Sequence, residues 1–139
     1  ERNRNALRQV LPQLQFLTFA YPKSGPTLQT KREVGRRFVA ARAGGQIGNT
    51  GVGDLSALNA CFLDQRTRIS KSDVQALIDR NAANRGWLIF ATHDIEAQSS
   101  PYGCTPDFLE MAVRKAALSG ADLVPLCEAV DLLSAIPTA

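Results

Sequence analysis

His93 is the only histidine in the 139-residue chain, and it follows the apolar run at residues 87–91. A run without polar members predicts a strand covered on both faces, as in a parallel sheet flanked by helices. His93 would then lie at the carboxyl end of that strand, where α/β folds place their chemistry. With an ordinary pKa of about 6.5, its imidazole suits a general acid or base. The alternative is a histidine that is satisfied by hydrogen bonds at a strand end.

Four further residues that could line or support a site follow predicted strands. Tyr21, Pro22 and Lys23 come after a candidate strand at residues 15–20 and begin a turn-rich loop. Asp94 comes directly after His93, and on a strand its side chain would point away from that histidine. Asp94 therefore has a supporting or loop-capping role, or it is a solvated loop carboxylate.

Two stretches of the chain resemble the NodB-like polysaccharide deacetylase family. Thr-His-Asp at residues 92–94 and Ser-Pro-Tyr-Gly-Cys-Thr-Pro at residues 100–106 are similar to the last part of that catalytic domain. Phe-Ala-Tyr-Pro-Lys-Ser-Gly at residues 19–25 resembles the family's Phe-Ala-Tyr-Pro-x-x-Gly segment. Together the stretches span most of the chain, and they match only the C-terminal half of such a domain.

The resemblance implies a role for each of these residues. His93 would protonate the departing amine of an N-acetyl sugar, and Tyr21 and Pro22 would line a groove for acetylated carbohydrate. Lys23 could contact an anionic substrate. Tyr102 could stack on a sugar ring, or it could be a surface aromatic that packs its loop down. Many members carry an orienting Arg where this chain has Ala20, although others share the Phe-Ala-Tyr-Pro version.

The resemblance also implies a divalent, zinc-like metal, usually held by one Asp and a His-x-x-x-His pair, with a further Asp as base. With a single His and no Thr-Phe-Asp-Asp-Gly-type motif, this chain does not contain the metal ligands. In the family these groups precede the segment that begins at Phe19. We therefore expect the chain to associate with a missing N-terminal half or with a second copy, because a half-barrel exposes sheet edges.

Two other interpretations remain open at this point. The chain could be a carbohydrate-binding or structural module that kept the fold without the metal site. It could also be an unrelated α/β domain that shares these strings by chance. Because the family mostly acts on cell-wall or exported polysaccharide, the resemblance favours an extracytoplasmic location, in the periplasm or outside the cell.

The elements around these motifs predict one α/β domain over residues 1–139. Helices are expected at residues 4–10, 27–41, 70–83, 107–119 and 128–135, and strands at 15–20, 58–63, 87–91 and 122–126. Such alternation predicts a parallel-rich sheet with flanking helices. By resemblance, this is the C-terminal part of a distorted (β/α) barrel. The glycine-dense stretch at residues 43–53 matches no phosphate-binding motif and predicts a short strand or an irregular loop.

Net charge, hydropathy and cysteine spacing limit the kinds of partner and metal site that the chain could have. The net charge of +3 favours neither nucleic acid nor a membrane surface, and no apolar segment approaches the ~20 residues that a membrane helix needs. The spacing of the three cysteines does not support a zinc site. Cys61 and Cys127 lie among apolar residues and are expected to be buried, whereas Cys104 could be exposed in its loop.

Overall fold

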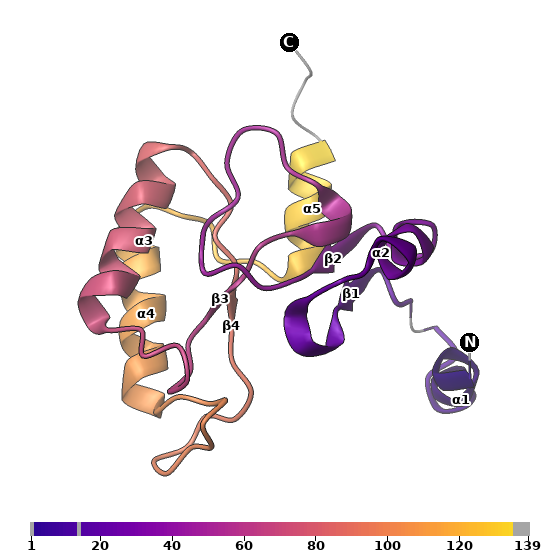
Figure 1. The fold of residues 1–139 in the computed structure, drawn as a ribbon, viewed down its shortest axis with the longest axis horizontal. Coiled ribbons are helices and arrows are strands. Elements are labelled where there is room, and N and C mark those ends of the chain that lie inside the picture. The colour runs from indigo at the N-terminus through magenta and orange to yellow at the C-terminus, as the bar shows by residue number, and fades with distance from the viewer. Residues whose placement is uncertain (1, 14, 135–139) are drawn as a thin grey trace.

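The computed structural model describes residues 2–13 and 15–134 and has an α/β architecture, as Figure 1 shows. Its helices are α1 (Arg2–Val10), α2 (Leu28–Gly35), α3 (Lys71–Ala83), α4 (Pro106–Leu118) and α5 (Leu126–Ser134). Its strands are β1 (Thr18–Ala20), β2 (Ala40–Arg42), β3 (Cys61–Phe62) and β4 (Phe90–Ala91). Two short 3-10 turns, η1 (Pro22–Ser24) and η2 (Leu55–Ala57), interrupt the loops.

The strands form two parallel pairs, β1 with β2 and β3 with β4. A parallel bridge between Arg42 and Leu58 joins the pairs. The Leu58 amide donates to the Ala41 carbonyl at 2.8 Å, and the Ala43 amide donates to the Leu58 carbonyl at 2.7 Å. The strands therefore lie side by side in the order of the chain, which confirms the parallel-rich sheet with flanking helices. The described residues form no closed barrel.

The apolar run before His93 packs on both sides of the sheet, as its composition predicts. Leu88 and Phe90 pack against the core that α3 and α4 share. Trp87 and Ile89 pack instead with the core around Val130 of α5. Successive side chains thus alternate between two apolar cores. The ordered strand is shorter than expected, because only residues 90–91 pair with β3, and its side chains are half-buried rather than fully covered.

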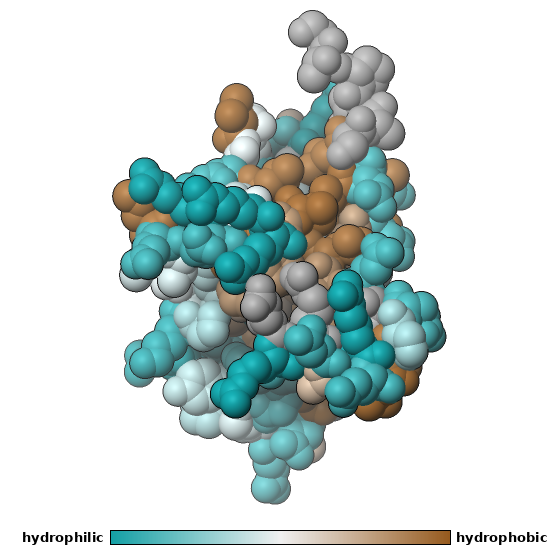
Figure 2. All heavy atoms as spheres, turned by 90° about the vertical axis from the view of Figure 1, so that its right-hand side faces the viewer, coloured by the Kyte–Doolittle hydropathy of each residue, from teal (hydrophilic) through white to brown (hydrophobic). Residues whose placement is uncertain are grey.

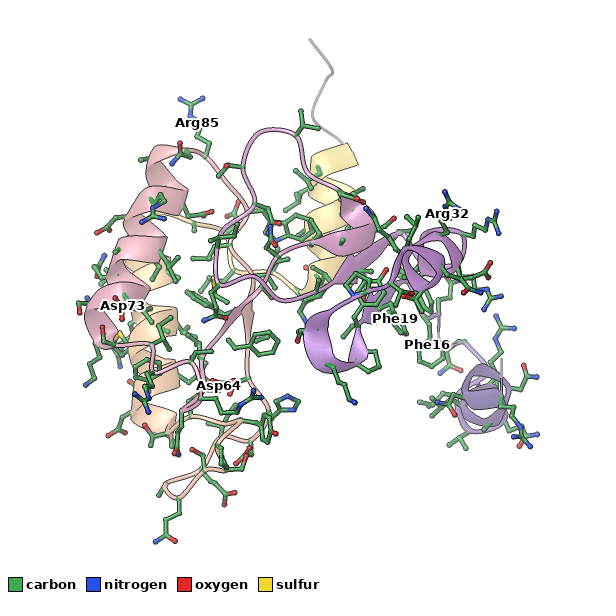
Figure 3. The ribbon with its side chains drawn as sticks, viewed as in Figure 1. Phe16, Phe19, Arg32, Asp64, Asp73 and Arg85 are labelled. Atoms are coloured by element: carbon green, nitrogen blue, oxygen red, sulfur yellow. The ribbon has the colours of Figure 1, made fainter. Side chains whose placement is uncertain are left out.

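Helix α2 covers the same sheet face as α3 and α4, at the β1 and β2 end. Its Val34 packs with Tyr21 and Ala41, and the Phe19 and Phe38 rings lie 5.1 Å apart between their centroids in this cluster. Figure 3 shows Phe19 beside β1 and α2, with Arg32 directed away from the sheet.

Side chains cap the starts of α3 and α4. The Ser70 hydroxyl accepts a hydrogen bond from the Asp73 amide at 3.1 Å, and the Asp73 carboxylate accepts one from the Ser70 amide at 2.8 Å. This reciprocal capping box satisfies amides that the first helical turn leaves unpaired. At the start of α4 the Thr105 hydroxyl accepts a hydrogen bond from the Phe108 amide.

Two expected elements are wrong. The helix predicted at residues 27–41 ends at Gly35, and residues 40–42 form strand β2 instead. Ala40 and Ala41 are both buried although they are adjacent, because they face opposite sides of the sheet. The strand predicted at residues 122–126 is absent, and residues 121–125 form an exposed segment before α5. Ala135, the expected end of the last helix, lies outside the described residues.

The N-terminal helix stands apart from the rest of the chain. Figure 1 shows α1 below and beside β1, and its apolar side chains Leu7 and Val10 are exposed. Figure 2 views the molecule from the right-hand side of Figure 1 and shows further apolar side chains gathered on the upper part of that face. Leu132 and Leu133 of α5, together with Val39 beside β2, are large exposed apolar residues.

The core that α3 and α4 share predicts which leucines stabilise the fold. Leu63 is fully buried there, whereas Leu118 at the end of α4 is 87% exposed. We expect Leu63→Ala to lower the free energy of unfolding by about 2–5 kcal/mol, since it leaves a cavity. The same change at Leu118 should alter it by less than about 0.5 kcal/mol. Urea unfolding followed by circular dichroism measures both, and equal effects would contradict this core assignment.

Candidate functional site

The loops that follow the four strands surround one open groove of about 1010 Å³. Most of the residues singled out from the sequence line it together, although they come from distant parts of the chain. These are Tyr21, Pro22, Lys23, His93 and Tyr102. Asp94 is not among the lining residues.

The register of the sheet explains which side chains reach the groove. Ala20 pairs with Arg42 across β1 and β2, and Phe62 of β3 lies two residues before Asp64. His93 lies two residues beyond Ala91, which pairs with Phe62. Because side chains two apart on a strand share a face, all these positions lie on one face of the sheet. This is the face that α5 covers nearer the strand starts, through Ala40 and Leu58.

Tyr21 anchors the first loop from beneath. Its side chain is buried, its hydroxyl donates to the Ser56 carbonyl at 2.8 Å, and its ring meets Phe19 edge to face at 5.4 Å between centroids. Burial raises the pKa of this phenol, with a smaller opposing effect from Lys31. Tyr21 therefore holds the loop in place, while Pro22 and Lys23 form its exposed rim.

The backbone around the groove is locally strained. Lys23, Ser24 and Gln46 line the groove with positive φ angles of 56°, 59° and 55°. Residues other than glycine rarely adopt this left-handed conformation, and such strain often gathers at functional sites. The Gly44 amide donates to the Ser24 carbonyl at 2.9 Å, so the loops after β1 and β2 support each other.

A stack of three side chains holds His93 at the other side of the groove. The Tyr102 ring meets the His93 ring edge to face, with 5.8 Å between centroids. The Arg66 guanidinium lies over the Tyr102 ring, 4.7 Å from its centroid. The Arg66 amide also donates to the Pro101 carbonyl at 3.1 Å. Tyr102 is about half exposed, so it both packs its loop and offers a free edge to the groove.

Asp94 caps the loop behind His93. Its carboxylate accepts hydrogen bonds from the Ser100 amide and from the Ser100 hydroxyl, both at 2.6 Å. These bonds lower the pKa of the Asp94 carboxyl, and the nearby His93 adds a smaller effect in the same direction. Gly103 completes the closure, because a Cβ at that position would lie 2.3 Å from the Asp94 carbonyl oxygen. The carboxylate thus has the expected loop-capping position.

Several charged groove residues were missed from the sequence. Arg42 ends β2, Asp64 follows β3, and Arg66 lies in the next turn. Figure 3 shows Asp64 beyond β3, and one oxygen of its buried carboxylate accepts the Thr67 amide at 2.8 Å. The position of Asp64 directly after a predicted strand was a usable signal. Arg42 had no such signal, because its segment resembles a helix in composition.

None of the three cysteines lines the groove, and the described residues contain no group of metal ligands. Cys104, which could have been exposed in its loop, is buried and accepts a hydrogen bond from the Thr92 hydroxyl at 3.6 Å. Cys61 is buried as expected, and burial raises the pKa of its thiol to about 11. Cys127 is half-buried. Over residues 2–13 and 15–134, no three His, Cys, Asp or Glu side chains are grouped so that they could hold a metal ion.

No family model, curated protein or solved structure matches this chain. Among the helices of the described residues, none is both long enough and apolar enough to span a membrane.

The Asp94 cap predicts a pH-dependent loop. We expect Asp94→Ala to lower the exchange protection of the Ser100 amide about tenfold, since a charge-assisted hydrogen bond is lost. In the unchanged chain this protection is present above the ordinary carboxyl pKa of about 3.9. It should fall as the pH drops through the lower folded-state pKa, and Asp94→Ala should abolish that dependence.

Hydrogen exchange with residue resolution, corrected for intrinsic rates, measures this effect. The Ser119 amide at the end of α4, which donates to backbone carbonyls, serves as the internal reference. A pH-independent Ser100 protection in the unchanged chain would contradict the capping role.

Proposed function

We propose that this chain forms the general-acid half of a metal-dependent deacetylase that acts on acetylated polysaccharide or a related carbohydrate. The observation that supports this most is the shared groove. Two motifs that resemble the NodB-like family lie about seventy residues apart, and both line it. The proposal explains why a rim of Pro22 and Lys23 faces His93 and Tyr102 across one opening.

His93 is the residue best suited to donate a proton. When an acetyl amide is hydrolysed, the departing nitrogen must gain a proton as its bond to carbon breaks. The His93 ring is exposed to the groove, so a bound sugar can reach it. Tyr102 would fix the plane of that ring and present its free edge to the sugar. Pro22 and Lys23 would contact the carbohydrate from the opposite rim.

The divalent metal does not fit the residues of this chain, since the described residues offer no group of ligands. In the proposal its ligands come from another segment. The strands of this chain are parallel and lie in chain order, which supports the comparison with one part of a (β/α) barrel.

A second candidate is a carbohydrate-binding module without catalysis. It is favoured by the surroundings of His93, whose ring nitrogens make no hydrogen bond to any described residue. A general acid usually has one nitrogen fixed by a partner that sets the tautomer. The binding-module interpretation needs only the groove, its aromatic edge and its charges.

The test of the first candidate is acetate release by the polypeptide that carries these residues. With chitotetraose or acetylated xylo-oligosaccharide, we expect release that a chelator abolishes. His93→Gln should lower kcat about 10²–10⁴-fold, because the leaving group loses its proton donor. Substrate binding should change little.

Glu96→Gln, an exposed change on the same loop, is the matched control and should retain full activity. Chelator-insensitive release would contradict the metal. Glycan binding without any acetate release would favour the binding module.

We further propose that the open edge of β1 pairs with the missing half. Within the described residues β1 pairs only with β2. The Tyr21 amide donates to the Arg42 carbonyl, and the Leu17 carbonyl accepts from the Val39 amide, so the backbone groups of both residues face β2. Because the backbone groups of successive strand residues point to opposite sides, the Thr18 amide faces the open edge. An unpaired edge readily accepts another strand.

This association predicts a particle heavier than 15.0 kDa. Intact mass under denaturing conditions tests for a longer polypeptide, and sedimentation velocity under native conditions tests for a partner or a second copy. Thr18→Pro should weaken the association, since it removes the outward amide, whereas Thr18→Val should not. A 15.0 kDa monomer in both measurements would contradict the proposal.

A further inference from the structure

Arg42 has a hydrogen-bond donor that nothing in the described chain uses. Its Nη1 atom is buried and has no partner among the described residues. The guanidinium lies over the Phe62 ring, 5.2 Å from the centroid, and it lines the groove. Desolvation lowers the pKa of this arginine. A buried cationic donor without a partner is costly, and an anion that reached it would remove that cost.

Two of the three other charged side chains in the described lining of the groove are also positive. Lys23 and Arg66 line it with Arg42, and none of these three forms an ion pair with a described carboxylate. Asp64 is the one acidic residue among the described lining, and it is largely buried with an oxygen held by Thr67. By contrast, Arg36 and Arg37 just after α2 and Arg114 on α4 all pair with glutamates. The groove therefore carries an uncompensated positive charge.

We infer that the groove binds a carbohydrate that carries an oxyanion, with Arg42 as the residue that receives it. A guanidinium presents two parallel N–H groups that match a carboxylate, sulfate or phosphate. The carbohydrate part of this inference rests on the proposed function, whereas the need for an anion rests on Arg42 and the charge of the groove alone.

Arg42 and His93 both line the groove but come from different parts of the sheet. Arg42 ends β2, whereas His93 follows β4, and β3 lies between these two strands. An anion at Arg42 and an acetyl group at His93 would therefore occupy two separate positions along the groove.

Direct binding to matched oligosaccharides tests the inference. Hyaluronan tetrasaccharide carries carboxylates and N-acetyl groups, and chitotetraose carries N-acetyl groups without charge. By titration calorimetry we expect hyaluronan to bind about tenfold or more tightly, in line with charge-assisted hydrogen bonds. Raising the salt concentration should reduce this preference. Chondroitin 4-sulfate tetrasaccharide, which carries sulfate in addition to carboxylates, shows whether a sulfate adds to the affinity, and inorganic phosphate distinguishes a glycan from a free anion.

Arg42→Gln should remove the preference for hyaluronan, and Arg42→Lys should restore only part of it, because lysine lacks the planar fork. Arg36→Gln removes one positive charge from the surface of α2 and should leave the preference unchanged. If Arg42→Gln lowers the thermal midpoint, the exposed pair Lys23→Gln and Arg66→Gln replaces it, with a smaller expected loss.

Equal affinity for the two tetrasaccharides, or an equal loss in Arg36→Gln, would overturn the inference. Binding of phosphate alone with the affinity of hyaluronan would overturn its carbohydrate part. Because binding needs no catalysis, Arg42-dependent hyaluronan binding without acetate release would leave the inference standing and remove the proposed deacetylase. Acetate release with no preference for charged oligosaccharides would do the reverse.

Discussion

The bridge between Arg42 and Leu58 is the contact on which the rest of the arrangement depends. It joins the pair β1–β2 to the chain that leads into β3, where backbone groups of β2 would otherwise have no partner. Buried amides and carbonyls must be paired, and the two hydrogen bonds around Leu58 satisfy them on both sides. Because all four strands then run parallel, their carboxyl ends meet at one edge. Through this arrangement the loop after β1 lines the same groove as His93.

The sequence predicts the parts of the fold in which local signals agree. A helix is predicted at residues 70–83, and the structure confirms it as α3 from Lys71 to Ala83 with Ser70 as its N-cap. The apolar run before His93 packs against apolar cores on both faces of the sheet, although only Phe90 and Ala91 form a strand and their side chains are half-buried. The groove follows from the same logic, since each strand end contributes the residues that come directly after it.

The sequence fails where tertiary packing outweighs local preference. Ala40 and Ala41 have low strand propensity and continue the helical pattern of α2, yet they form the centre of the sheet. Small side chains suit that position because α2 and α5 approach it from opposite faces. Leu123 and Val124 show the converse, because their residue types favour a strand, yet they pair with no strand of the described chain and are exposed. Tyr102 and Arg66 meet through a contact between two loops, which no pattern in either loop encodes.

The two sides of the groove differ in how firmly their functional groups are held. Arg42 is half-buried with its guanidinium over the Phe62 ring, and its Nη1 atom has no hydrogen-bond partner among the described residues. His93 is held by one aromatic contact and by a loop that Asp94 closes from behind, and its ring nitrogens form no hydrogen bond with a described residue. Proton transfer requires a donor with a fixed tautomer and direction, whereas anion binding requires only a placed charge. The described groove thus meets the requirement for anion binding more fully than that for proton transfer, and in the proposed deacetylase the group that orients His93 would come from the substrate or from the proposed partner segment.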